Sequence, residues 1–108
     1  MPAGLALLVA AGLEIGGCWL VHAVLRLGWH PAFLLPAVAI LLGFGWALTL
    51  VDTGGSGRTF AIYGGVYVAA SLVWLRAVEG VSLTPFDLAG AALVLAGAGV
   101  IHLGARAG

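Results

Sequence analysis

Charged side chains are scarce in this sequence. Only 7% of its 108 residues are Asp, Glu, Lys or Arg, whereas an average soluble domain carries about a quarter. A chain with so few polar side chains cannot cover a surface that faces water. Because 63% of its residues are hydrophobic, the composition places the protein in the membrane class.

Several other features are missing, and each absence excludes a class of function. Lysine is absent and the four arginines form no basic run, so the sequence predicts no nucleic-acid partner. The lone cysteine, Cys18, cannot form a disulfide within the chain. No basic residue precedes the first apolar run, which argues against a signal peptide. The sequence shows no nucleophile–base pair, metal-ligand cluster or phosphate-binding loop, so we expect neither an enzyme nor a bound metal or cofactor.

What the chain does contain is a series of long apolar runs. Each has roughly the 20 residues that a membrane-spanning helix needs. The runs cover residues 3–25, 32–51, 59–78 and 86–105. The turns between them are short and rich in Gly, Pro and charge, so neighbouring helices should run antiparallel. The sequence therefore predicts an all-α membrane protein, a single domain of four transmembrane helices over 1–108, whose function lies among the helices in the lipid bilayer.

The arginines give no preferred orientation in the membrane. Arg26 and Arg76 lie in the first and third turns, on one side, while Arg58 and Arg106 lie on the other. The positive-inside rule counts such residues, and here the count is two against two. We therefore expect insertion in both orientations, with a topology fixed by local factors as the alternative.

Glu14 lies in the middle of the first apolar run. Eleven residues separate it from either end of 3–25, which is roughly 16 Å of helix and close to half the bilayer core of about 30 Å. A charge at this depth is costly and normally faces a bundle interior or a wet cavity. Withdrawal from water favours the neutral acid, so Glu14 can exchange a proton near neutral pH. Small residues one turn away leave room beside it: Ala10, Ala11, Gly17 and Cys18. The alternative is a protonated Glu14 that hydrogen-bonds a neighbouring helix as packing.

The third run carries a stripe of aromatic and hydroxyl side chains. Its members lie within about 80° of one another on a helix: Tyr63, Tyr67, Ser71 and Trp74. Aromatic faces attract organic cations, and a tyrosine hydroxyl can hydrogen-bond a carboxylate. Ordinary helix packing would explain the stripe equally well when it is taken alone. Together with Glu14 and Cys18, we take these residues as candidates for binding protons and a cationic small molecule.

Glycine stripes and one histidine suggest further roles. Gly90 and Gly97 lie seven residues apart, on one face of the fourth helix, and such stripes let helices approach closely in lipid. They are candidate contacts of a homodimer. The adjacent Gly64 and Gly65 suit either a hinge in the third helix or close packing. His22, two turns from Glu14, suits either proton relay or packing.

Two segments resemble the signature of a known family. "EIGGC" begins at Glu14, and "SGRTFAIYGGVYVAASLVWLRAVEGVSLTPFDLAG" covers 56–90. In order and spacing they are similar to the YnfA family of bacterial inner-membrane proteins, a branch of the small multidrug resistance superfamily. The likeness spans nearly the whole chain. This chain has Val21 and His22 where that family tends to have Pro and Trp.

The resemblance implies a multi-pass protein of the bacterial inner membrane. It implies a four-helix protomer in an antiparallel homodimer of dual topology, which exports cationic compounds in exchange for protons by alternating access. Glu14 would be the site shared by proton and substrate, with Tyr63 and Tyr67 lining it, and Gly90 and Gly97 would lie on the dimerising helix. From the residues alone, a passive channel and a structural membrane subunit without transport remain as alternatives, and the sequence does not identify the cation.

Overall fold

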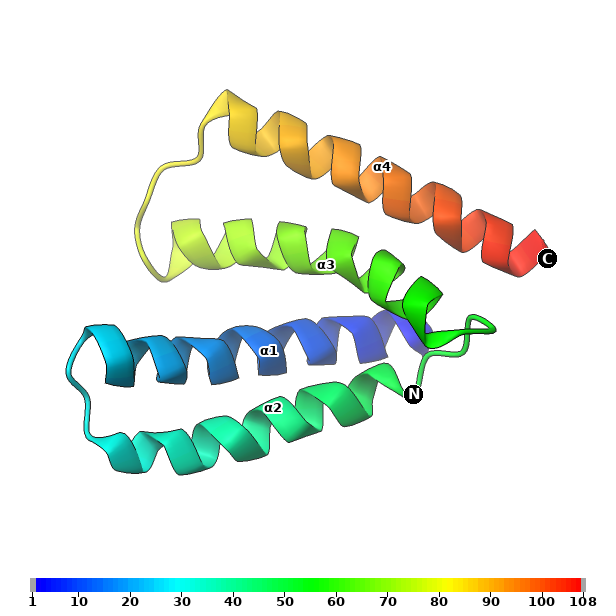
Figure 1. Ribbon diagram of the computed structural model, residues 1–108. Helices are drawn as coiled ribbons and strands as arrows, with labels where there is room; N and C mark the ends of the chain where they lie inside the picture. The colour runs from blue at the N-terminus through cyan, green and yellow to red at the C-terminus, as the bar shows by residue number, and fades with distance from the viewer. Residues whose placement is uncertain (1, 108) are drawn as a thin grey trace. The chain divides into compact units, whose positions relative to one another are not determined.

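The computed structural model describes residues 2–107, which form helices joined by short turns (Figure 1). The helices are α1 (Ala3–Arg26), the 3₁₀ turn η1 (Pro31–Phe33), α2 (Leu34–Leu48), α3 (Ser56–Ala77) and α4 (Pro85–Ala107). With η1 counted at the start of α2, all four long helices have the length and composition to cross a membrane. The predicted all-helical fold with four such helices is confirmed.

The helix ends differ from the predicted ones by up to three residues. The second helix ends at Leu48, where the apolar run continued to Val51. There the amides of Thr49, Leu50 and Val51 bond to carbonyls three residues back, so the last turn tightens. The third helix begins at Ser56, before the apolar run at 59. Its first turn contains Ser and Arg, which a search for apolar residues does not include.

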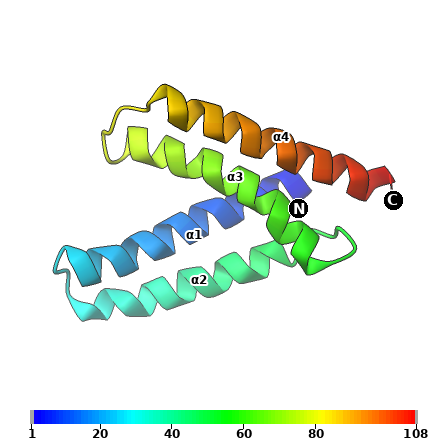
Figure 2. The same ribbon diagram turned by 45° about the horizontal axis from the view of Figure 1, so that its top comes forward.

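The chain divides after Val51 into two compact units. The first consists of α1 and α2 and the second of α3 and α4, and in each unit the two helices lie side by side and antiparallel (Figures 1 and 2). The short turns explain this arrangement, because a chain that leaves one helix must enter the next at the same end.

Glycines bring the helices of the first unit together. A Cβ added at Gly17 on α1 would lie 2.7 Å from Leu41 Cγ on α2 and 3.4 Å from the Ala37 carbonyl oxygen. A Cβ added at Gly43 on α2 would lie 3.6 Å from Leu13 Cδ1 on α1, an ordinary van der Waals contact. Since lipid offers no hydrophobic drive between helices, close van der Waals contact of this kind is what holds a membrane hairpin together.

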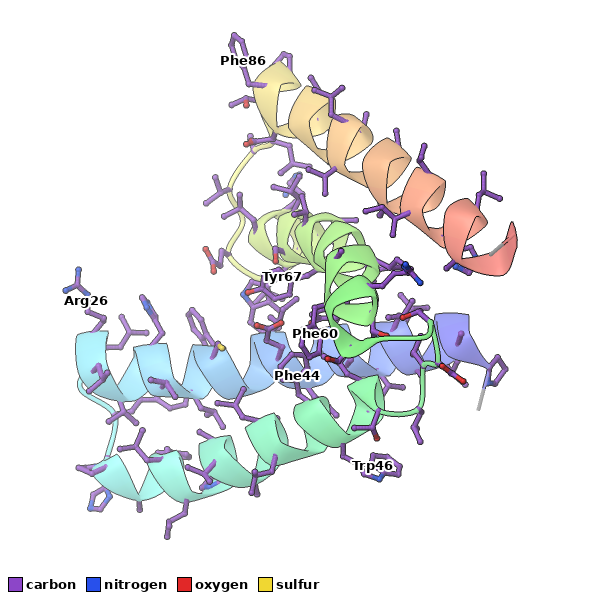
Figure 3. The ribbon with its side chains drawn as sticks, turned by 45° about the vertical axis from the view of Figure 1, so that its right-hand side comes forward. Arg26, Phe44, Trp46, Phe60, Tyr67 and Phe86 are labelled. Atoms are coloured by element: carbon purple, nitrogen blue, oxygen red, sulfur yellow. The ribbon has the colours of Figure 1, made fainter. Side chains whose placement is uncertain are left out.

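The second unit has one close contact of the same type. A Cβ added at Gly65 on α3 would lie 2.6 Å from Ala98 Cβ and 3.4 Å from the Val94 carbonyl oxygen, both on α4. Within the part of α4 whose side chains the structure describes, Ala98 is the only buried residue. The helix otherwise exposes large apolar side chains, of which Phe86 at its start is 89% exposed (Figure 3).

Local hydrogen bonds set where the helices start and stop. The turns that follow α1 and α3 contain Gly28 and Gly80, both in the left-handed region at φ 77° and 72°, which side chains rarely adopt. At the start of α4, the amide of Asp87 donates to Thr84 Oγ1 while the Thr84 amide donates to Asp87 Oδ2. This reciprocal pair is a capping box.

Candidate functional site

Glu14 lies at the middle of α1 and is half-buried. The two alanines before it on the same side, Ala10 and Ala11, are buried to 0% and 2% exposure. Cys18, one turn further along, is exposed. Glu14 and Cys18 are therefore neighbours on one face of α1, as the spacing predicted.

The space expected beside Glu14 is partly occupied. Leu41 of α2 lies directly against Gly17, so this glycine permits helix contact and does not leave a cavity next to the carboxylate. Cys18, on the same face of α1 as Glu14, is exposed.

The predicted stripe on α3 brings two tyrosine rings into contact. The centroids of Tyr63 and Tyr67 lie 5.9 Å apart, with the ring planes tilted by 49°. Tyr63 is only 6% exposed, while Tyr67 is half-buried. Aromatic ring faces attract cations, and a tyrosine hydroxyl can donate or accept a hydrogen bond.

Ser71 continues the stripe with an unsatisfied hydroxyl. Its Oγ is buried and makes no hydrogen bond within the described residues. Leaving a buried hydroxyl without a partner costs about 1–3 kcal/mol, and a ligand or a further protein group could relieve that cost. Ser71 is thus a stronger candidate for a binding role than its place in the sequence indicated.

Trp74 ends the stripe in a different environment. Its indole Nε1 donates a 3.2 Å hydrogen bond to Glu79 Oε1 in the turn after α3. The sequence did not predict this pairing with Glu79, because helical spacing does not extend into a turn. The only feature of the sequence that could have indicated this hydrogen bond is a polar residue one to two turns after a tryptophan near a helix end. One edge of the Trp74 ring is therefore held by a hydrogen bond to the turn that follows its own helix.

The glycine pair on α3 divides into two roles. Gly65 is in close contact with α4, whereas a Cβ at Gly64 would meet no atom of residues 2–107 within 4 Å. Figure 3 shows α3 changing direction between the labelled Phe60 and Tyr67, the stretch that contains this pair. Adjacent glycines are a known cause of helix bending, so Gly64 fits the predicted hinge and Gly65 the predicted packing.

The predicted dimer glycines lie on an open face of α4. Neither Gly90 nor Gly97 would bring an added Cβ within 4 Å of any described atom. The contact between α4 and α3 uses Val94 and Ala98 instead. Gly90 and Gly97 are thus not used for helix packing within their own unit.

His22 is exposed near the end of α1, and its ring stacks on Trp19. The centroids lie 5.3 Å apart and the ring planes differ by 26°. The contact between His22 and Trp19 was not predicted, although a spacing of three residues places both on one helix face.

Comparisons with known proteins agree with this description. The sequence model of the "Uncharacterised BCR, YnfA/UPF0060 family" matches residues 2–107. A "UPF0060 membrane protein" of Methylocella silvestris is 49% identical over 106 residues, which cover 98% of both chains. Another, of Gluconacetobacter diazotrophicus, is 52% identical over 92 residues, or 85% of this chain and 81% of that relative. No solved structure matches the chain. The relatives are named membrane proteins, in accord with the four helices that are able to span a bilayer.

Proposed function

Since this chain belongs to the YnfA/UPF0060 family of membrane proteins, we propose that it exports cationic compounds in exchange for protons. The proposed location is the bacterial inner membrane, in keeping with relatives that are bacterial membrane proteins. The observation that carries the proposal is the position of Glu14. Of the four acids it alone lies inside a helix away from the ends, since Asp52 and Glu79 lie in turns and Asp87 in the first turn of α4.

The proposed mechanism is competition between a proton and a cation for the Glu14 carboxylate. In the absence of a cation a proton occupies the carboxyl group, and a bound organic cation replaces that proton. In the second unit, the Tyr63–Tyr67 pair has aromatic faces and Ser71 an unsatisfied hydroxyl, and these are proposed as further cation-binding groups. Exposure of the site to alternate sides of the membrane would couple the two fluxes. Each elementary charge that crosses 100 mV supplies about 2.3 kcal/mol.

The proposed assembly is an antiparallel homodimer of dual topology. It is supported by the equal arginine count on the two sides, and by the open face of α4 at Gly90 and Gly97. In such a dimer the two copies of Glu14 belong to one site and would titrate as a coupled pair.

Replacing Gly97 by leucine is expected to separate the dimer without unfolding the chain. The side chain would project from the glycine face and hold a second copy away, while no described atom of its own chain lies within 4 Å. Gly99→Leu is the matched control, because Gly99 is equally open but lies about 200° around the same helix. The measurement is cross-linking in lipid vesicles. Equal loss of dimer in both variants, or loss in neither, would remove Gly97 from the interface.

Transport itself is tested with the purified protein in lipid vesicles. In vesicles that are acidic inside, the pH gradient should drive uptake of tetraphenylphosphonium or guanidinium. The rate of uptake should saturate as the cation concentration rises. Empty vesicles and vesicles with collapsed gradients are the controls. Flux that rises linearly with concentration and ignores the gradient would identify a channel. No flux for any organic cation would favour a structural role, and either result would overturn the proposal.

A further inference from the structure

A line of polar side chains runs along the second half of α1. Its members follow each other at intervals of four residues: Glu14, Cys18, His22 and Arg26. Each interval is about 6 Å along the helix axis with a rotation of about 40°, so the line winds slowly around the helix. It leads from mid-depth to the helix end, where Arg26 is exposed (Figure 3).

His22 is the one member of this line with an imidazole ring, a group that serves as a proton shuttle in proteins. It is exposed, and it makes a ring contact with Trp19 but no hydrogen bond within residues 2–107. Neither ring nitrogen is therefore occupied by a group of residues 2–107. An indole face attracts cations, so Trp19 can hold the ring in place in its charged form as well as in its neutral form.

The surroundings of His22 contain few competing groups. On its own helix the titratable and charged neighbours are Cys18 and Arg26, with Glu14 two turns away. The elements packed against α1 in this unit are α2 and the turn η1. Neither Leu34–Leu48 nor Pro31–Phe33 includes a titratable side chain, but His30 precedes η1, and its Nδ1 accepts a hydrogen bond from the Ala32 amide. Within α1 and α2, His22 is thus the only imidazole between Glu14 and the end of α1.

We infer that His22 carries protons between Glu14 and the membrane face at which α1 ends. The inference rests on the proposed function, in which Glu14 releases a proton when a cation binds. The proton leaves the Glu14 carboxyl through hydrogen-bonded water, because about 12 Å separates the two positions along the helix. It joins one ring nitrogen of His22, and the other nitrogen gives up its proton to bulk water. Each transfer leaves His22 neutral but in the other tautomer, and proton exchange with water or a turn of the ring restores the first one.

The test follows proton release with a pH-sensitive dye in stopped flow. The protein is in lipid nanodiscs, and tetraphenylphosphonium is the added cation. His22→Gln should release as many protons as the parent, but about 100-fold more slowly, which is the lower end of what a positioned acid–base group contributes. Imidazole in the buffer should restore the rate in proportion to its concentration. The matched control is His102→Gln, which changes an exposed histidine on α4 and should leave rate and amount unchanged.

Three results would overturn the assignment. The rate could be unchanged in His22→Gln, it could fall without rescue by imidazole, or the variant could alter only the affinity for the cation, which would indicate an electrostatic effect. Failure of the proposed function gives a different pattern, because the parent protein itself would then release no proton when the cation is added. The parent and variant traces from one experiment therefore distinguish the two.

Discussion

Replacing Glu14 by glutamine is expected to abolish proton release on cation addition while the helices still form and insert. Glutamine has the same size and can keep a hydrogen bond, but it has no proton to exchange and no charge to attract a cation. A hydrogen bond to a charged group contributes about 1.5–3 kcal/mol, so the affinity for an organic cation should also fall by about 10- to 100-fold. The measurements are dye-detected proton release and cation binding, with circular dichroism to check helix content.

The matched control for this variant is Asp52→Asn. Asp52 lies in the turn between α2 and α3, where its Oδ1 accepts a hydrogen bond from the Gly54 amide. Asparagine retains that oxygen, so the turn and the proton release should both be preserved. Glu14→Asp keeps the charge but withdraws it by one methylene, and should release protons with a changed cation affinity. If Glu14→Gln still transported cations against a pH gradient, Glu14 would be a packing residue and the proposed mechanism would be wrong.

The membrane class follows from composition and the four helices from the apolar runs, for a physical reason. Scarce charge excludes a water-facing surface, and apolar runs of bilayer length leave the helix as the structure that satisfies the backbone in lipid. The boundaries do not follow as closely, because hydropathy reports the surrounding medium while hydrogen bonds decide where a helix stops. Val51 is apolar but lies beyond α2, and Ser56 is polar but begins α3.

The small residues around the candidate site are harder to interpret from sequence. A glycine beside a functional group is equally suited to leave space or to admit another helix. Gly17 looked like space next to Glu14, yet Leu41 fills it. Gly64 and Gly65 are adjacent and chemically identical, yet one is open and the other is pressed against α4. The difference lies in which residue from a distant part of the sequence packs against each glycine. A single sequence does not contain that information.

The stripe on α3 shows a second limit of periodic patterns. Spacing placed Tyr63 and Tyr67 on one face, and the structure brings their rings together. The same spacing included Trp74, whose indole N–H bonds to Glu79 beyond the end of the helix. Helical periodicity predicts which side chains share a face, but it cannot follow the chain into a turn.

Substituting Gly65 by alanine is expected to lower the free energy of unfolding by about 1–3 kcal/mol, the usual cost of overpacking. The new Cβ would lie 2.6 Å from Ala98 Cβ, and a methyl group attached directly to a backbone cannot rotate away. Gly64→Ala is the matched control, since an added Cβ there has no neighbour within 4 Å in the described chain. It should stabilise the helix by about 0.5–1 kcal/mol, because alanine loses less backbone freedom than glycine.

The partner of Gly65 can be tested by a double substitution. Ala98→Gly removes the methyl group that the new Cβ would meet, so Gly65→Ala with Ala98→Gly should recover most of the lost stability. Unfolding of each variant in mixed micelles with increasing detergent gives the four free energies of the cycle. Additive effects would show that the contact with Ala98 is not the source of the cost.

Measuring transport as well as stability in these variants separates a packing role from a bending role. If Gly65 serves only the contact with α4, then Gly65→Ala should lower both the stability and the transport rate. Adding Ala98→Gly to that variant should then restore both. If Gly64 is the hinge, Gly64→Ala should instead raise stability while it slows cation exchange, because it removes backbone freedom without touching a neighbour. A Gly64→Ala variant that is stabilised and transports at the parent rate would exclude a hinge at this position.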